Sequence, residues 1–308
     1  MRHFILALLL SMTPACTASD PNQPVETGTV AGGRDLEAAL AASGRSGKPV
    51  FALFQEVPGC AGCQQFGREV LSHPLVREAI ESGFTPLLIH NNKPGADAAA
   101  LQRFGEPAWN FQVVRFLNAK GADLLPRRDR VWDTGPLAAR MGAALAAAKR
   151  PVPAWLSLLA AEHSAGLKQA AFTMQCFWTG EMELGKIPGV ITTEAGFLGG
   201  AEVTLVRYDP QAITLAALIV AAEKVRCAQA VHVPADDLAA AKAARLTVGT
   251  LAGYRAAPAG DQQKQLSGTA AAALHLTGAQ ATKVNAFLRT DPARALTFLT
   301  PSQQARLK

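Results

Sequence analysis

Cysteine is scarce in this chain, which has only five among 308 residues. Disulfide-stabilised domains are short and dense in cysteine, so the sequence excludes that class. Cys16 belongs to an N-terminal segment considered below, and the other four are Cys60, Cys63, Cys176 and Cys227. Because these cysteines are few and far apart, they are better explained as reactive thiols than as parts of a network of structural disulfides. The six histidines are dispersed as well and stand at no ligand spacing, so we expect neither a metal nor another cofactor.

The chain also lacks clustered positive charge and any long apolar run beyond its first residues. Its formal net charge is +6, yet lysine and arginine are scattered, and the densest group is Arg127, Arg128 and Arg130. A solvated loop explains such a group, so we expect no nucleic-acid partner. No later segment is long and apolar enough to span a bilayer. A length of 308 residues with 49% hydrophobic content predicts about two globular domains.

The first residues have the pattern of an export signal. Arg2 supplies positive charge, Phe4 to Leu10 form a short apolar run, and small residues follow, so we predict a signal peptide or lipoprotein signal over residues 1–18. Thr13-Pro14-Ala15-Cys16 is similar to a bacterial lipoprotein cleavage box, in which Cys16 carries the lipid; plain secretion with cleavage near Ala18 is the alternative. Both routes predict an exported protein, either periplasmic or anchored to a bacterial membrane through Cys16.

The next part of the chain has the pattern of a tether followed by an α/β domain. Residues 19–33 are rich in Pro, Gly and Thr, which is typical of a flexible tether. Hydrophobic spacing then predicts helices and strands in alternation. The expected elements are a helix over 34–43, a buried strand over 49–54, a helix after Cys63, a helix over 73–80, strands over 84–90 and 113–117, a hairpin turn over 118–121 and a helix over 134–148.

Cys60 and Cys63 form a Cys-x-x-Cys pair between the first buried strand and a helix. A thiol at a helix N-terminus has a lowered pKa, and the second thiol lies one turn away, within disulfide reach. Lys48-Pro49-Val50-Phe51-Ala52-Leu53-Phe54 leading into Pro58-Gly59-Cys60-Ala61-Gly62-Cys63 resembles the thioredoxin superfamily. The resemblance implies a thioredoxin-like fold over residues 34–149 and thiol–disulfide exchange at the pair. A structural disulfide or a metal clip is the alternative.

One feature departs from that superfamily. Thioredoxins carry a proline just before the third strand, facing the Cys-x-x-Cys pair. Trp109-Asn110-Phe111-Gln112 occupies this place here, and Pro107 stands several residues earlier. We expect this change to affect substrate docking and the redox potential rather than the cysteine chemistry.

A second domain follows a proline-bearing linker. Arg150-Pro151-Val152-Pro153 ends the preceding helix, and a helix containing Trp155, Leu158 and Leu159 is expected to bridge onward. Residues 150–168 are therefore predicted as linker and bridging helix, and residues 169–308 as the second domain.

In the second domain an apolar run ends at Cys176, directly before a helix-like pattern. A helix N-terminus favours a thiolate, and Phe177 and Trp178 offer an apolar wall beside it. These features predict a reactive cysteine next to a small non-polar pocket.

Several short motifs then follow in a distinctive order. Cys176-Phe177-Trp178 is followed by Ile187-Pro188-Gly189-Val190, Gly196-Phe197-Leu198-Gly199-Gly200, Ala201-Glu202-Val203 and Tyr208-Asp209-Pro210. This order resembles peptide methionine sulfoxide reductase A, most specifically over Gln169 to Glu223. The resemblance implies an α/β (α+β) domain that reduces methionine sulfoxide, free or in proteins, and that depends on an external thiol–disulfide reductant.

Sulfoxide reduction needs a soft nucleophile for sulfur and an acid for the departing oxygen. Cys176 as thiolate supplies the nucleophile and becomes a sulfenic acid. By the resemblance, Glu202 occupies the place of the acid, as a strand carboxyl whose partial burial would raise its pKa. The resemblance also places Phe177 and Trp178 in the methyl-binding pocket and loosely matches Tyr254 to a tyrosine that contacts the sulfoxide oxygen.

Cys227 is the candidate resolving cysteine, because a second thiol can condense with a sulfenic acid on Cys176. Each role has a structural alternative. Either cysteine is an inert buried thiol, Phe177 and Trp178 are core residues only, or Glu202 is a solvent-facing strand residue.

The second domain also departs from the reductase family. The family's long loop between its glycine pair and its acidic strand is missing, because Gly200 runs directly into Ala201-Glu202. We therefore expect a reduced or altered substrate pocket. Further along, Thr277-Gly278-Ala279-Gln280 and Thr300-Pro301-Ser302-Gln303 match capping boxes, which predict two short packing helices.

These observations favour an exported thiol oxidoreductase that reduces methionine sulfoxide through Cys176 and carries its reductant, Cys60 and Cys63, on the same chain. Tethering gives the reductant a roughly millimolar effective concentration. The alternative from another class is a thiol–disulfide exchange protein whose second domain is a degenerate, non-catalytic reductase that binds client proteins. Metal or copper handling through Cys60 and Cys63 is a third hypothesis.

Overall fold

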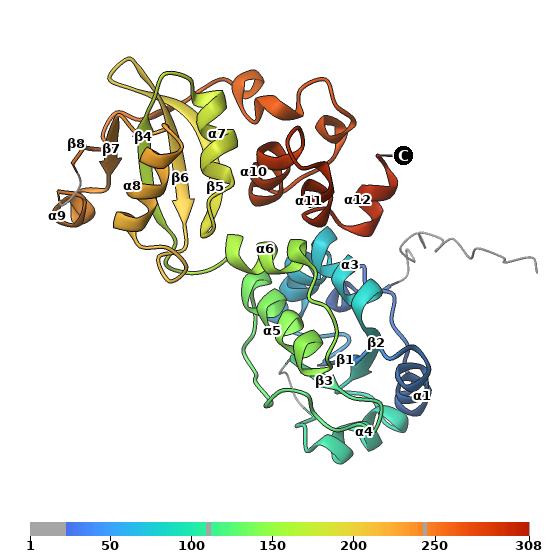
Figure 1. Ribbon diagram of the computed structural model, residues 1–308. Coiled ribbons are helices and arrows are strands. Elements are labelled where there is room, and N and C mark those ends of the chain that lie inside the picture. Colours follow the sequence, from blue (N-terminus) through green and yellow to red (C-terminus); the bar gives the residue numbers. More distant parts are fainter. Residues whose placement is uncertain (1–22, 109–111, 243–244, 308) are drawn as a thin grey trace, which may run out of the picture.

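The structure is a computed structural model that describes residues 23–108, 112–242 and 245–307. Two α/β domains follow one another along the chain, and helix α6 lies between them (Figure 1). The predicted export signal with Cys16, and residues 109–111, lie outside the described residues. Within the described residues, no helix has both the length and the apolar character needed to cross a membrane.

The first domain is built on a three-stranded sheet of order β2-β1-β3, in which β1 is parallel to β2 and antiparallel to β3. Its elements are η1 (Val25–Thr27), α1 (Leu36–Ser46), β1 (Val50–Gln55), α2 (Ala61–Gln65), the π-helix η2 (Phe66–Leu71), α3 (Pro74–Gly83), β2 (Thr85–His90), α4 (Ala96–Phe104), β3 (Val113–Leu117) and α5 (Thr134–Ala147). Every residue of β1 is buried, because helices cover both faces of this central strand. β1 therefore delivers the chain to Cys60 from the middle of the domain.

The sequence prediction for this domain holds for its main strands and helices and fails in two places. Helix α4 was not predicted, although its Ala100 and Leu101 are buried in the core. The prediction of a flexible tether is wrong for residues 23–33, because this segment packs against the domain: Glu26 is 3% exposed and Val30 is 1% exposed. These residues pack because Gly67 has no side chain, so that the backbone of Val25 can lie directly against the helix there.

The second domain is built on a six-stranded sheet of order β8-β7-β4-β6-β5-β9, antiparallel except between β7 and β8. Its elements are β4 (Lys168–Thr173), α7 (Phe177–Gly185), β5 (Val190–Leu198), β6 (Ala201–Tyr208), α8 (Leu215–Lys224), β7 (Ala230–Val233), η3 (Ala235–Asp237), α9 (Leu238–Ala241), β8 (Thr247–Thr250), β9 (Arg255–Ala256), η4 (Ala259–Asp261), η5 (Lys264–Leu266), η6 (Ala270–Ala273), α10 (Gly278–Phe287), α11 (Pro292–Thr297) and α12 (Pro301–Ala305).

Helices α7 and α8 pack on the same face of this sheet. Leu184 of α7 and Leu218 of α8 share one core with Phe172 of β4 and Val206 of β6. Alternation along the strands sends their neighbours to the opposite face, where Glu194 is exposed. Helix α10 lies beside α7 and β5, and α11 packs against α10 (Figure 1).

Helix α6 (Ala154–Glu162) contributes to the cores of both domains, as the linker pattern predicted. Its Trp155 and Leu156 are buried in the first domain, whereas Leu158 packs with Ile191 and Ala279 of the second. A polar contact adds to this interface, because Glu78 of α3 accepts a hydrogen bond from the backbone N–H of Ser302 at 2.7 Å. The predicted capping boxes are confirmed at the starts of α10 and α12.

Candidate active site

Cys60 and Cys63 lie where β1 gives way to α2, and their sulfur atoms are 3.6 Å apart. Cys60 is the N-cap residue of α2, and its pKa is lowered, chiefly by a hydrogen bond from the backbone N–H of Cys63. Cys63 is fully buried, and burial raises the pKa of its thiol to about 12. Both thiols are free. Cys60 is therefore the thiol prepared for attack, and Cys63 is the thiol that stays protonated behind it.

The loop before this pair is held by the N-terminal segment, which the sequence did not mark as functional. The Glu26 carboxylate accepts a hydrogen bond from the Gly59 N–H at 2.8 Å. The Gln55 amide at the end of β1 donates to the main-chain carbonyls of both Glu26 and Cys63. A sequence signal for Glu26 was absent, because it stands in a stretch with the composition of a tether.

The position where thioredoxins have their proline is only partly described. Residues 109–111 lie outside the described residues. Gln112 is buried, and its amide donates to the Val131 carbonyl oxygen at 2.9 Å. The next residue, Trp132, is 37% exposed, and its ring lies against Gly62 between the two cysteines. An open aromatic surface therefore adjoins the Cys60–Cys63 pair.

Cys176 stands at the predicted junction, three residues beyond β4 and at the N-cap position of α7. It is a half-buried free thiol. Glu202 is the second residue of the neighbouring antiparallel strand β6, and its backbone carbonyl accepts a hydrogen bond from the Met174 N–H at 3.2 Å. Its carboxylate accepts from the Phe177 N–H at 2.8 Å. The fold thus brings the predicted acid to the residue that directly follows the predicted nucleophile.

The two aromatic residues after Cys176 have different surroundings. Phe177 is 5% exposed and meets Phe197 of β5 edge-to-face, with ring centroids 5.4 Å apart. Trp178 is 36% exposed, and its ring lies 5.9 Å from that of Phe177. Phe177 is therefore a core residue directly after Cys176, and the ring of Trp178 is partly exposed.

Tyr254 lies against β5, beside Glu194 and Gly196. Its hydroxyl donates to Glu194 at 2.6 Å, and its ring occupies the space where Gly196 has no side chain. Residues along a strand alternate between faces, so Tyr254 and Phe177 lie on opposite faces of β5. Burial, and next the contact with Glu194, raises the pKa of Tyr254. The structure does not bring the Tyr254 hydroxyl to Cys176.

Cys227 lies in the turn between α8 and β7, beside the end of β4. The Gln229 N–H donates to the Thr173 carbonyl oxygen at 2.8 Å, which holds this turn close to the segment leading to Cys176. Cys227 is 2% exposed, and burial raises the pKa of its thiol to about 11, with further contributions from the charges of Glu183 and Cys176. The two thiols therefore lie within electrostatic reach of each other.

A tight hairpin joins β5 to β6 at the place where the sequence predicts that the reductase family's long loop is missing. Gly199 and Gly200 join β5 to β6 with φ values of 59° and 85°. Two successive positive φ angles are typical of the type I′ turn, which glycine adopts readily. The chain therefore passes from β5 to β6 with no intervening loop.

Glu181 is a further acidic residue near this site, and the sequence did not single it out. It is fully buried on α7, and both carboxylate oxygens accept hydrogen bonds from Gln263 at 2.8 and 2.9 Å. Burial raises its pKa to about 8. A lone glutamate in a helix gives no sequence signal of burial, because only the tertiary fold places Gln263 over it.

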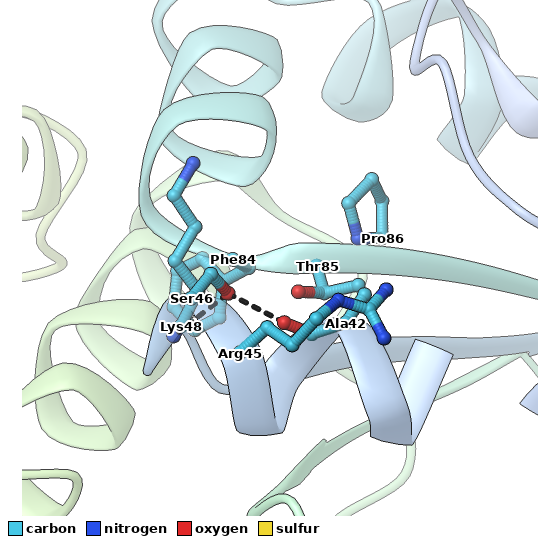
Figure 2. A pocket seen from close by; sticks show the side chains of 7 residues that line it. All are labelled: Ala42, Arg45, Ser46, Lys48, Phe84, Thr85 and Pro86. Atoms are coloured by element: carbon cyan, nitrogen blue, oxygen red, sulfur yellow. Dashed lines mark hydrogen bonds between the residues drawn. The ribbon is translucent and has the colours of Figure 1, made fainter. Parts of the chain in front are cut away.

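Other features of the described residues do not enlarge the site. A pocket on the first domain is lined by residues from the end of α1 and the start of β2, and none of the candidate cysteines borders it (Figure 2). Among the described residues, no three His, Cys, Asp or Glu side chains gather as metal ligands.

Comparison with known proteins gives two kinds of similarity. A family described as thioredoxin-like matches residues 31–114. Peptide methionine sulfoxide reductase MsrA of Rhodospirillum centenum is 35% identical over 115 residues, covering 32% of this chain and 46% of that protein. The Brucella ovis protein of the same description is 38% identical over 71 residues, covering 18% of this chain and 33% of that protein. The chain therefore spans less than half the length of these curated relatives.

Among solved structures, methionine sulfoxide reductase A of Corynebacterium diphtheriae aligns with 36% of this chain and 80% of its own, at 20% identity and a TM-score of 0.30. A score this low adds nothing to the assignment. The chain combines a thioredoxin-like domain with a domain similar to methionine sulfoxide reductase A, in a mixed α/β architecture. Among the described residues, Cys60, Cys63, Cys176 and Cys227 are all free thiols.

Proposed function

We propose that this chain reduces methionine sulfoxide at Cys176 and that Cys60 and Cys63 restore the oxidised site. The observation that carries the proposal is the 2.8 Å hydrogen bond from the Phe177 N–H to Glu202. It holds a carboxyl group at the residue that directly follows half-buried Cys176, and this supports the pairing of nucleophile and acid that the reaction needs. The similarity to MsrA supports the same reaction.

The reaction balances with the residues of the second domain. The Cys176 thiolate attacks the sulfoxide sulfur, and Glu202 protonates the oxygen as it leaves that sulfur for the cysteine. The products are the thioether and a sulfenic acid on Cys176. The Cys227 thiol then condenses with the sulfenic acid, which releases water and forms the Cys176–Cys227 disulfide.

Regeneration uses the asymmetry of the first pair. The Cys60 thiolate attacks the disulfide of the second domain and forms a mixed disulfide, which Cys63 resolves by forming the Cys60–Cys63 disulfide. The lowered pKa of Cys60 and the raised pKa of Cys63 favour this order. An external dithiol must then reduce Cys60–Cys63, so the proposal includes a thiol–disulfide partner.

The test is consumption of methionine sulfoxide by the purified full chain with dithiothreitol as reductant. Turnover that disappears in Cys176→Ser and persists in Cys60→Ser supports the proposal, because dithiothreitol replaces the first domain. Turnover no higher than in Cys176→Ser, in a chain that still reduces a protein disulfide, would overturn it. Coupling is tested with Cys63→Ser, which should trap the mixed disulfide between the two domains.

A second candidate function is favoured by two observations. The tight turn at Gly199-Gly200 removes the family's loop, and the Tyr254 hydroxyl is engaged by Glu194. A thiol–disulfide exchange protein with a non-catalytic second domain that binds client proteins would show both. In that case the chain would reduce disulfides through Cys60 and bind methionine-containing proteins without consuming sulfoxide.

Export is a further part of the proposal, supported by the pattern of the first residues. Cell fractionation would detect the chain outside the cytoplasm. Cys16→Ser distinguishes the two routes, because it releases a lipid-anchored chain from the membrane and leaves a simply secreted chain where it was.

A further inference from the structure

A positively charged side chain, Lys264, lies over the ring of Trp178. The Lys264 ammonium nitrogen lies 4.7 Å from the centroid of the Trp178 ring. Trp178 is the second residue of α7, and helical side chains lean toward the helix N-terminus, which here is the end that bears Cys176. The ammonium group is therefore placed at the rim of the cysteine site, over a ring that is 36% exposed.

The segment that presents Lys264 is tightly anchored on both sides of the lysine. The Gln262 amide accepts a hydrogen bond from the Ala195 N–H and donates to the Ala195 carbonyl, both at 2.9 Å. Gln263 holds both oxygens of buried Glu181 and adopts a positive φ of 49°. Gln265 donates its N–H to Asn285 at 2.8 Å. With its neighbours anchored in this way, the backbone of Lys264 has a defined position beside α7.

The surrounding charges decide what this ammonium can attract. Asp261 is its ion-pair partner at 3.6 Å, and the two side chains are 35% and 36% exposed. An exposed pair at this distance is weak and leaves the ammonium open to another anion. The same nitrogen donates to the Gly260 carbonyl at 3.0 Å, which is a neutral partner. The acidic groups close to the cysteine, Glu181 and Glu202, are engaged by backbone N–H groups instead.

We infer that Lys264 determines specificity at the Cys176 site by favouring sulfoxide substrates with a carboxylate close to the reacting sulfur. Free methionine sulfoxide is the simplest member of this class, because its α-carboxylate is joined to the sulfoxide by a short flexible chain. As Trp178 contacts the methyl group, Lys264 pairs with the carboxylate. This inference rests on the function proposed above and names its substrate class.

The charge at the rim is tested with two alkylating reagents that differ in charge. Iodoacetate is an anion and iodoacetamide is neutral, and both modify Cys176 on the full chain. Trypsin releases residues 169–186, which contain Cys176 and no other cysteine, so mass spectrometry follows this thiol alone. Lys264→Met should lower the ratio of the iodoacetate to the iodoacetamide rate about fivefold at low salt, and Asp261→Asn should raise it.

Two variants separate charge from structure. Lys264→Arg should keep the ratio, because it keeps a cation over the ring. Lys242→Met removes a lysine at the far edge of the sheet, after α9, and should leave the ratio unchanged. A ratio that does not fall in Lys264→Met, or that falls equally in Lys242→Met, would overturn the inference.

The substrate class is tested by comparing free methionine sulfoxide with N-acetyl-methionine sulfoxide amide, which has no carboxylate. The wild type should have a higher kcat/KM for the free amino acid than for the amide. In Lys264→Met, the ratio of the two kcat/KM values should fall about fivefold, as the alkylation ratio does. An unchanged preference in the variant would overturn the assignment. If the wild type reduces neither sulfoxide, the proposed function fails and the substrate assignment fails with it, whereas the alkylation ratio still reports whether Lys264 selects anions.

Discussion

The Phe177 main-chain N–H and the Glu202 carboxylate are joined across two elements, at the point where α7 begins beside β6. Cys176, the N-cap residue, makes no side-chain cap of its own, so Glu202 satisfies a donor that the helix leaves free. One interaction therefore completes the helix end and holds a carboxyl group beside the thiol.

Glu202→Gln separates these two roles. The amide oxygen can still accept the Phe177 hydrogen bond, but the side chain can no longer donate an acid proton. We expect kcat for sulfoxide reduction to fall about 100-fold or more, with a melting temperature close to that of the wild type. Glu194→Gln, on the opposite face of the sheet, is the matched control and should reduce turnover far less. Equal turnover in Glu202→Gln and wild type would exclude Glu202 as the acid.

Tyr254→Phe tests the predicted site residue of the second domain that lies on the opposite face of β5 from Phe177. Because the hydroxyl donates to Glu194, its removal should lower the free energy of unfolding by about 1 kcal/mol. Turnover should stay within about twofold of the wild type, since the hydroxyl does not reach the thiol. Denaturant unfolding and steady-state kinetics on the same preparations decide this. A loss of turnover as large as that of Glu202→Gln would show that Tyr254 reaches the substrate.

The first pair should react in a fixed order with iodoacetamide. The pKa of Cys60 is lowered by hydrogen bonds from backbone N–H groups, and burial raises that of Cys63 to about 12. At neutral pH the reduced native chain should therefore be labelled at Cys60 first. In Cys60→Ser, Cys63 should remain almost unlabelled until the chain is unfolded. Comparable labelling of both cysteines in the native chain would contradict this assignment.

Cys227→Ser should stop the second domain at the sulfenic acid. With Cys60→Ser and Cys63→Ser as background, one equivalent of methionine sulfoxide should yield a Cys176–Cys227 disulfide, detected by peptide mapping. In the added Cys227→Ser variant, the same treatment should leave a Cys176 adduct with dimedone, a reagent for sulfenic acids. A disulfide that forms without Cys227 would assign the resolving role to another thiol.

Glu181 should make the stability of the wild type fall as pH rises. Its pKa is raised from 4.5 to about 8 in the folded chain, so the folded state holds a proton that the unfolded state has released. Its contribution is complete below pH 4.5 and is lost as pH rises toward about 8. In Glu181→Gln this loss should be absent. The free energy of unfolding of the wild type should fall by an additional amount on the order of 2 kcal/mol between pH 5 and 8.5, and parallel curves for the two proteins would contradict the assignment.

Sequence pattern was most successful where an element depends on neighbours in the chain. Burial of β1, the turn at Gly199-Gly200 and the capping boxes at Thr277 and Thr300 follow from local residue order. The helix-start positions of Cys60 and Cys176 could be predicted for the same reason, because each stands where a strand passes into a helix.

Pattern failed where a residue depends on distant partners. The composition around Glu26 predicts a tether, yet Glu26 is buried because Gly67 leaves room for its segment and the Gly59 N–H donates to its carboxylate. Composition describes what a segment does alone, and it contains no information about the surface that receives the segment. The burial of Glu181 could not be predicted for the same reason, since its partner Gln263 is far from it in the chain.

The sequence by itself determined which residues are candidates for the proposed chemistry: two thiols one turn apart, a third thiol at a strand–helix junction, and an acidic residue after a glycine turn. These are properties of residue type and local spacing. Only the tertiary structure decided which of them meet. It brought Glu202 to Phe177, placed Cys227 in the turn that is hydrogen-bonded to the end of β4, placed Tyr254 on the opposite face of β5, and set Lys264 over Trp178. Strand pairing and side-chain alternation decide such contacts, and both are set by the order of strands in the sheet.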